Sequence, residues 1–521
     1  MPDKSCPKCN HTFIVTKSDV ELYKKLLIPS PTHCPDCRHQ RRLCWRNDRT
    51  FYSRKCDQTG QEFVSMYSAD SNLTVYHPDA FYKEDWDPLD YGRDLDFSRP
   101  FFDQFFELQQ TVPRLGIDIV HCENSYFCNY CGDDKNCYLD IAGEGNEDCY
   151  FNLFTKLSKN CVDCTFAYNS ELCYETIQAY NGYNLNYCIN CDDCSDCSFC
   201  YDLKGCQDCL FSTNLRQKKY YIFNKPYSKE EYKRKKTELD FSSYEKTKKA
   251  LTQWQEFRLK NAIHQDASLI NCENSTGNNL KNCKNTHLSF NATNCEDCKY
   301  LYDVLDAKDC QDLNYSLYKP EVAFELISTL QMRYSAFCMA SHYCNHCYYC
   351  DLTNNSSDCF GCIGLKRNKY CILNKQYSKE EYFELRDRLI EHMKKTKEWG
   401  QFFPAEKSLW KYEETVANEY FPVSTDQKSS SDTPQSDASS CETCSKNFLL
   451  IEQELKFYQQ KGLPNPQNCP DCRHESRIQL RPKRQLFKRP CSNCNSPIQS
   501  TFKKDFAGQV FCEKCYLETL Y

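Results

Sequence analysis

The sequence predicts a multi-domain protein: small zinc-ribbon or treble-clef modules at both ends flank a duplicated, Cys-rich β-solenoid of about 12-residue repeats with capping α-helices. Three observations lead to this fold class. The hexapeptide CPDCRH occurs at Cys34–His39 and again at Cys469–His474. The 15 cysteines between Cys122 and Cys209 all lie at multiples of three residues from one another. Finally, a chain of 521 residues is longer than one typical domain.

Two zinc sites follow from identical cysteine spacings at the two ends. Each has the pattern C-x2-C, 24 further residues and C-x2-C, which brings four thiolates to the tetrahedral geometry of structural zinc. The copies are 435 residues apart and also share Phe, Tyr, Pro and Arg positions, so coincidence of cysteine pairs is the weaker explanation. The predicted ligands are Cys6, Cys9, Cys34 and Cys37, and then Cys441, Cys444, Cys469 and Cys472.

A third site is predicted from C-x2-C-x17-C-x2-C near the C-terminus. Its ligands are Cys491, Cys494, Cys512 and Cys515. The N-terminal counterparts are Cys56, Thr59, His77 and Ala80. Because only Cys56 and His77 remain as ligands, and two ligands do not close a tetrahedral site, we expect no zinc there and a module held by packing of Phe63, Tyr67, Tyr76, Phe81 and Tyr82. The cofactor prediction is therefore Zn²⁺, about three per chain.

The segments CPKCNHTF…YKKLLIPSPTHCPDCRHQRR and CETCSKNF…YQQKGLPNPQNCPDCRHESR resemble the bacterial "probable zinc-ribbon" family. The resemblance covers about 40 residues at each end and implies zinc binding, but no process. The rest of the chain, including Trp86–Phe102, resembles uncharacterised bacterial Cys-rich proteins that join such modules to a cysteine-repeat body.

The central cysteines follow a 12-residue grid, and the whole pattern recurs about 150 residues later. A fixed short repeat with small inward residues is typical of a β-solenoid, and Cys fills a narrow interior as a small buried hydrophobe. Asn or Asp before Cys, as at Asn136, Asp148 and Asn160, indicates left-handed corners. In the second copy the grid slips by one residue, and residues 320–334 are expected to form a short helix. The alternative is a metal or iron–sulfur array.

Each repeat ends in a predicted helix that begins with a capping box, at Ser228–Glu231 and Ser378–Glu381. We expect the first to continue to about Ala262 and the second to about Trp399. Residues 424–440 have the composition of a disordered linker, so we expect the C-terminal zinc pair to be tethered rather than packed. The predicted segments are 1–55 zinc-ribbon module 1, 56–118 degenerate zinc module and acidic/aromatic connector, 119–227 solenoid repeat 1, 228–268 helix, 269–377 solenoid repeat 2, 378–423 helix and tail, 424–440 linker, and 441–521 tandem zinc-ribbon module 2.

A basic segment follows each CPDCR knuckle. Arginines on a zinc-stabilised scaffold can bind phosphates, and neighbouring rings can stack on unpaired bases. The alternative is a solvated basic face that pairs with the acidic body. The candidate nucleic-acid-binding residues are Arg38, Arg41, Arg42, Arg46, Arg49, Arg473, Arg477, Arg481 and Arg484.

The motifs that the sequence lacks argue against several function classes. No GxSxG, Walker, dinucleotide or HExxH motif occurs, and four-thiolate zinc leaves no open position for substrate, so we expect no enzyme. We find no secretory signal, and no apolar run is long enough to span a membrane. We therefore expect a cytoplasmic protein. The preferred function is a non-catalytic zinc protein that binds RNA or single-stranded nucleic acid. A protein–protein scaffold built on the Cys ladder is the alternative, and a metal-storage or redox thiol protein the third.

Overall fold

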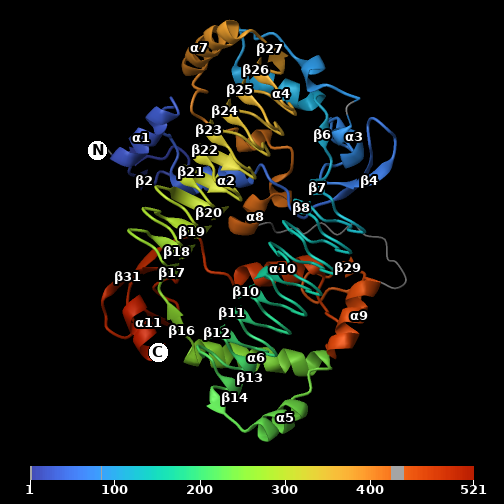
Figure 1. Ribbon diagram of the computed structural model, residues 1–521, viewed down its shortest axis with the longest axis vertical. Helices are drawn as coiled ribbons and strands as arrows, with labels where there is room; N and C mark the ends of the chain where they lie inside the picture. Colours follow the sequence, from blue (N-terminus) through green and yellow to red (C-terminus); the bar gives the residue numbers. More distant parts are fainter. Residues whose placement is uncertain (1–2, 84, 424–438) are drawn as a thin grey trace. The chain divides into compact units, whose positions relative to one another are not determined.

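The computed structural model describes residues 3–83, 85–423 and 439–521, drawn as a ribbon in Figure 1. The chain divides into two compact units. Unit 1 comprises Met1–Ile117, Ala267–Val423 and Arg484–Leu486, and unit 2 comprises Asp118–Asp266, Ser424–Lys483 and Phe487–Tyr521. Each unit therefore combines zinc-module sequence from one end of the chain with one of the two cysteine repeats. Among the described residues, no helix has the length and apolar character needed to span a membrane.

The cysteine repeat in unit 2, here called the first Cys ladder, covers residues 119–227. Its strands are short and pair in parallel with a register of 12 residues, as Ile177 with Ile189 and Ile189 with Tyr201. Single bridges with the same register fill the intervals. The strands are β7 (Ile119–Val120), β8 (Cys131–Gly132), β9 (Thr165–Tyr168), β10 (Ile177–Tyr180), β11 (Ile189–Asp192), β12 (Tyr201–Lys204), β13 (Gln207–Leu210), β14 (Lys219–Ile222) and β15 (Lys225–Pro226).

The period of three arises from the backbone. Within the ladder, every third residue has the left-handed conformation, for example Asn136 (φ 53°), Leu139 (φ 49°) and Ala142 (φ 54°). The next residue points inward and is often Cys, and the third makes the bridge to the neighbouring coil. Twelve residues thus form a coil with four sides of three residues. The predicted left-handed corners at Asn136, Asp148 and Asn160 are present.

Two kinds of hydrogen bond offset the cost of so many left-handed residues, which is about 1–2 kcal/mol each for an L-residue. Each corner N–H donates to a carbonyl of the preceding coil, as Asn136 N to Glu123 O at 2.9 Å. Asn and Asp corners also bond along the stack: Asn169 Nδ2 donates to Asn181 Oδ1, and Asn181 Nδ2 to Asp193 Oδ1, both at 2.7 Å.

The second Cys ladder, residues 269–377 in unit 1, forms an 11-stranded sheet in chain order from β17 to β27. The predicted slip of the grid consists of one coil of 11 residues, seen in the pairing of Leu269 with Leu280, and one of 13, seen in that of Cys310 with Ala323. The strands are β17 (Leu269–Ile270), β18 (Gly277–Lys281), β19 (Ser289–Thr293), β20 (Lys299–Leu305), β21 (Lys308–Asn314), β22 (Glu321–Ile327), β23 (Arg333–Ala336), β24 (Asn345–Tyr348), β25 (Ser357–Phe360), β26 (Lys369–Ile372) and β27 (Lys375–Gln376).

The prediction of a helix at 320–334 is wrong, because this segment forms β22 and the start of β23. Its extra residue lies at a corner, where Tyr318 and Lys319 are both left-handed (φ 59° and 66°). The neighbouring strands β21 and β23 hold the segment in the sheet, and a short apolar run is compatible with either a helix or a buried strand.

Both ladders end alike, in an antiparallel hairpin and a helix whose capping box is confirmed by the bonds between Ser228 and Glu231 and between Ser378 and Glu381. The second helix is α7 (Lys379–Lys395). The first expected helix is two helices, α5 (Lys229–Glu238) and α6 (Tyr244–Asn261), because Ser243 starts a new N-cap. Tyr232 and Trp254 of this pair cover a stacked column of Phe199, Phe211 and Phe223 on the ladder's outer face.

The C-terminal zinc pair is packed, not tethered. It belongs to unit 2 with the first Cys ladder, and α9 (Glu452–Lys461) places Phe457 and Tyr458 against Tyr174. The predicted linker lies, apart from its last two residues, outside the described residues.

The 11-residue coil should depend on Gly277. Its φ is +149°, and a Cβ there would lie 1.9 Å from the Ser289 carbonyl oxygen. We expect Gly277→Ala to lower the thermal midpoint of unit 1 by several degrees, measured by circular dichroism. Gly60→Ala is the matched control, because Gly60 also has positive φ (+72°) but open space around it. Equal effects of the two substitutions would contradict the proposed clash.

Candidate zinc centres and arginine clamps

The first zinc centre is built from a hairpin and a helix. The turn between β1 (Lys4–Ser5) and β2 (Thr12–Phe13) supplies Cys6 and Cys9. Cys34 is the N-cap of α2 (Pro35–Leu43), and Cys37 lies in its first turn. All four sulfurs lie within 4.8 Å of one another, and Cys9 Sγ is 3.5 Å from Cys34 Sγ. This grouping suits tetrahedral zinc.

The second centre repeats this arrangement. The strands β28 (Ser439–Ser440) and β29 (Asn447–Phe448) hold Cys441 and Cys444, and α10 (Pro470–Gln479) begins at Cys469. Cys444 Sγ lies 3.7 Å from Cys469 Sγ. Burial raises the pKa of the Cys441 thiol, but backbone N–H groups of Cys469, Cys444 and Thr443 outweigh burial and lower the pKa to about 6. The equivalent Cys6 is also lowered to about 6, against burial, by backbone N–H groups of Cys34, Cys9 and Lys8. Such thiolates are ready metal ligands.

The third centre uses Cys491, Cys494, Cys512 and Cys515, also within 4.8 Å. Its elements are β30 (Phe487–Pro490), β31 (Pro497–Ser500), β32 (Gln509–Phe511) and α11 (Glu513–Leu520). The prediction of about three zinc ions is confirmed by these three four-cysteine groups.

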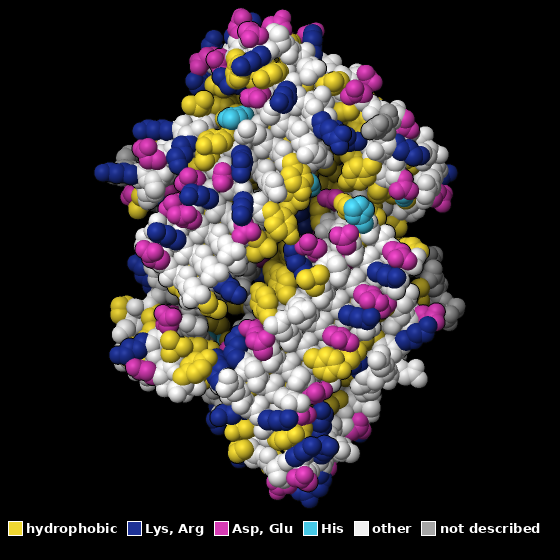
Figure 2. All heavy atoms as spheres, in the orientation of Figure 1, with side chains coloured by type: hydrophobic (Ala, Val, Ile, Leu, Met, Phe, Trp, Pro, Cys, Tyr) yellow, Lys and Arg dark blue, Asp and Glu magenta, His cyan; other side chains and the backbone are white. Residues whose placement is uncertain are grey.

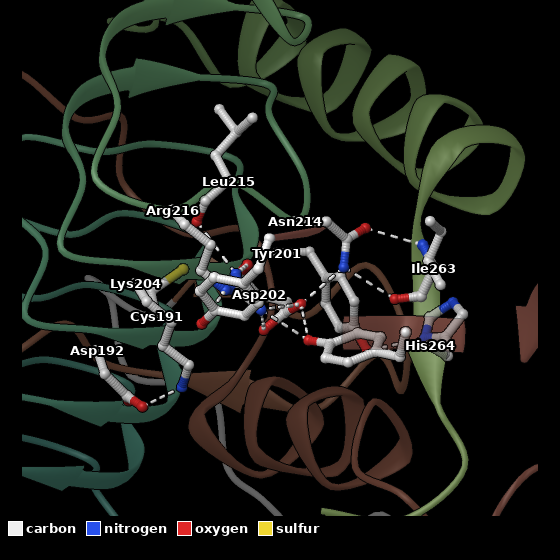
Figure 3. Close-up of polar contacts among 12 residues, drawn as sticks. Cys191, Asp192, Tyr201, Asp202, Lys204, Asn214, Leu215, Arg216, Ile263 and His264 are labelled. Atoms are coloured by element: carbon white, nitrogen blue, oxygen red, sulfur yellow. Dashed lines mark hydrogen bonds and ion pairs between the residues drawn. The ribbon is translucent and has the colours of Figure 1, made fainter. Parts of the chain in front are cut away.

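Polar contacts join the third centre to the first Cys ladder. β32 pairs in parallel with β16 (Ile263–Gln265), and Asn214 exchanges two 2.8 Å hydrogen bonds with the Ile263 backbone. Figure 3 shows Asp202 beside Arg216 and Asn214 beside Ile263. The Arg216 Nη2 atom lies 3.0 Å from Asp202 Oδ2. The Tyr516 hydroxyl of α11 donates to Asp202, and Arg216 donates to that hydroxyl at 2.7 Å.

The module with the altered site keeps its hairpin, β3 (Tyr52–Lys55) and β4 (Glu62–Ser65), and its short helix α3 (Pro78–Tyr82). Its Cys56 thiol accepts a 3.3 Å hydrogen bond from the His77 backbone N–H. Aromatic packing supports this module: Phe63, Tyr76 and Phe81 pack around Cys56, and Tyr67 is buried, whereas Tyr82 is half exposed.

The arginines after CPDCR lie inside the protein. In unit 1, Arg38 Nη2 lies 2.7 Å from Asp312 Oδ2, and Arg42 Nη1 lies 3.2 Å from Asp312 Oδ1. Arg41 donates to both oxygens of Glu325 at 2.9 Å. Arg38, Arg42, Asp312 and Glu325 are almost completely buried. Here and below, such a group of arginines bound to ladder carboxylates is called an arginine clamp.

Unit 2 contains the same clamp. Arg473 Nε lies 2.9 Å from Asp163 Oδ2, and Arg477 Nη1 lies 2.8 Å from Asp163 Oδ1 and 3.3 Å from Glu175. Burial lowers the pKa of Arg473, but Asp163, Tyr458 and Glu454 outweigh it and hold the pKa above its ordinary value, so the guanidinium stays charged.

The two clamps are related by both internal duplications. Arg473 and Arg477 follow Arg38 and Arg42 by 435 residues, while the ladder residues Asp312 and Glu325 follow Asp163 and Glu175 by 149 and 150. Ring contacts repeat too: Tyr23 lies edge-on to Phe324 at 5.2 Å, and Tyr458 to Tyr174 at 5.6 Å. Arg46 covers the ring of Tyr315 at 4.5 Å, and Arg481 that of Phe166 at 4.1 Å.

This placement differs from the expectation that nine arginines form a phosphate-binding surface. Arg46 also pairs with Asp48 at 2.6 Å, Arg484 pairs with Asp303 and covers Tyr420, and Arg49 is half-buried. None of the nine is exposed. The sequence analysis did not identify the ladder carboxylates that bind these arginines, which are Asp163, Glu175, Asp312 and Glu325. Their recurrence after 149 or 150 residues, the offset of the ladders themselves, is the sequence signal that could have identified them.

The comparisons with known proteins agree with the zinc modules. Residues 437–480 match the sequence model of a family described as "probable treble clef domain". No curated protein matches the chain. A solved structure from Desulfovibrio desulfuricans G20, named "putative acetyltransferase", is 8% identical, with a TM-score of 0.12, and the match covers 44% of this chain and 63% of that one.

Zinc occupancy can be tested centre by centre. We expect Cys37→Ser, Cys472→Ser and Cys515→Ser each to remove one zinc ion per chain, because three thiolates no longer close the site. Native mass spectrometry of the intact chain counts the ions. Cys44→Ser is the control, since Cys44 belongs to none of the four-cysteine groups. A variant that keeps the wild-type number would contradict the ligand assignment.

Removing a clamp arginine should destabilise its own unit. We expect Arg477→Ala to cost about 3–5 kcal/mol of unfolding free energy, because it leaves Asp163 and Glu175 buried with less compensation. Arg42→Ala should act equally on unit 1. Urea unfolding measures both, with the exposed Lys488→Ala as control. A loss below about 1 kcal/mol would show that the buried pairs do not hold the modules in place.

Proposed function

We propose that this is a non-catalytic, zinc-stabilised scaffold in which two β-solenoids, the Cys ladders, present surfaces to a protein partner. The treble-clef modules act as clips that fix each solenoid through its arginine clamp. Because the terminal cysteines are grouped as zinc ligands and the clustered ladder cysteines form no disulfides, we place the protein in a reducing compartment such as the cytoplasm.

The single observation that carries this proposal is the pairing of the clamp arginines with carboxylates of their own unit. A guanidinium that binds a phosphate must be open to solvent, and Arg38, Arg42 and Arg477 are at most 1% exposed. Breaking such a pair to bind RNA would leave a buried carboxylate uncompensated. The basic segments therefore support intramolecular clips better than a nucleic-acid surface.

The surface of the solenoids suits protein recognition. On the first ladder, Tyr126 is 62% exposed, Tyr180 48% and Tyr183 45%, and Tyr168 stacks on Tyr180 with ring centroids 5.0 Å apart. Tyrosine is enriched at interface hot spots. On the face drawn in Figure 2, Lys and Arg side chains alternate with Asp and Glu, without a large patch of one sign. That mixture favours a protein partner over a polyanion.

Binding of RNA and of single-stranded DNA separates the two functions. We expect weak binding by the intact chain at physiological salt, and no selective loss of it in Arg41→Ala/Arg481→Ala. Fluorescence anisotropy against salt concentration is the measurement, and Lys488→Ala controls for the loss of one exposed charge. Tight binding whose salt slope falls in the double variant would support the nucleic-acid function instead.

Site-specific photo-crosslinking tests the protein-binding surface. A photoreactive residue at Tyr183 should give a discrete, nuclease-resistant adduct in the source cell, and Tyr180→Ala should abolish it. The same probe at Lys488, an exposed position of unit 2 outside the ladder, is the matched control. Adducts that are nuclease-sensitive, or equal at both positions, would contradict a protein-binding surface here.

A further inference from the structure

We infer that the second coil of the first Cys ladder holds a fourth divalent metal ion, with Asp134, Cys137 and Asp140 as ligands. These residues occupy three successive inward positions of one coil, so three of its four sides point a ligand toward the same interior. The Cys131 thiol occupies the fourth side and donates to the Asp140 carbonyl oxygen at 3.0 Å.

The ligand atoms converge. One atom each of Asp134, Cys137 and Asp140 lies within 4.8 Å of the others, and all three residues are buried. The residue that follows Cys131 by one coil is Gly143, and it lies against this group. A Cβ at Gly143 would lie 2.6 Å from Asp134 Oδ2 and 2.6 Å from Asp140 Oδ2. Asn146 Nδ2 would lie 2.8 Å from the same point, so only glycine at position 143 lets the two carboxylates and this amide come together so close to the backbone.

The carboxylates lack compensation by protein groups. Asp134 Oδ1 accepts a 2.9 Å hydrogen bond from Asn146 N, but the buried Asp134 Oδ2 has no hydrogen-bond partner. Among the described residues, Asp140 accepts only from Thr155 Oγ1 at 3.0 Å and Asn146 Nδ2 at 2.9 Å. In the described part of the chain, neither aspartate forms an ion pair with Lys, Arg or His. Burying two charges without a counterion is costly.

A divalent cation relieves that cost and explains the unpartnered oxygen. A mixed set of carboxylate and thiolate ligands suits zinc, because Ca²⁺ and Mg²⁺ require oxygen ligands throughout. The site is independent of the scaffold function proposed above.

The second ladder provides an internal comparison. At the equivalent inward positions it carries Leu280, Cys283, Thr286 and Ser289, all of them buried and none a carboxylate. The coil geometry therefore does not require Asp at these positions. Asp140→Ser converts the first ladder to the side chain that the second already accommodates.

Native mass spectrometry of the full chain, purified without chelator and supplied with zinc, tests the site. We expect four zinc ions per chain in the wild type and three in Asp140→Ser. Thr176→Ser is the matched control, because Thr176 is also an inward residue but lies three coils from Asp140. This variant should keep four zinc ions. Cys137→Ala should also hold three.

Three ions in the wild type would overturn the inference, even if Asp140→Ser failed to fold. Four ions retained in Asp140→Ser and in Cys137→Ala would overturn it as well, because the fourth ion would then lie elsewhere. Cys37→Ser, which should hold one ion fewer than the wild type, calibrates the count against a four-cysteine site. These zinc counts do not depend on whether the ladders bind a protein partner.

Discussion

The buried pairing between arginines of the zinc modules and carboxylates of the ladders is the interaction on which each unit depends. A treble clef of about 40 residues has a small core, and its stability comes largely from zinc. A ladder of short strands has corners that strain the backbone and an outer face that must be covered. The clamp joins the two, because Asp163 and Asp312 each bind two guanidinium groups supplied by one short helix.

Zinc acts at a distance in this arrangement. Cys469 starts α10 and Cys472 ligates from its first turn, so the metal fixes the position of the helix that carries Arg473 and Arg477. The arginines then lock that helix onto the ladder. This coupling explains why CPDCR and the arginine row are duplicated together, and why the ladder carboxylates are duplicated with them. The CPDCR motif and its arginines therefore link zinc binding to the packing of the module on its Cys ladder.

Sequence spacing predicted the zinc ligands, the 12-residue register and the left-handed corners, because each depends on local geometry that repeats. It left open whether the arginines bind phosphate or pair with acidic residues of the body, because their partners lie 274 residues away in Arg38–Asp312 and 314 in Arg477–Asp163. A basic run looks the same whether it meets phosphate or a buried carboxylate. The strand at Glu321–Ile327 was missed for a similar reason: only its neighbours β21 and β23 select strand over helix. Asp134 and Asp140 lie on the same three-residue grid as the cysteines, but the convergence of their oxygens with the Cys137 sulfur within 4.8 Å depends on how the coil closes, which spacing alone does not give.

A double-mutant cycle on Arg477 and Asp163 tests the clamp most directly. Unfolding of unit 2 would be measured for Arg477→Ala, Asp163→Asn and the combined variant. If the pair holds the module on its ladder, Asp163→Asn should recover part of the loss caused by Arg477→Ala, with a coupling of about 1–3 kcal/mol. Losses that simply add would contradict the clamp, because they would mean that the two residues stabilise the unit independently.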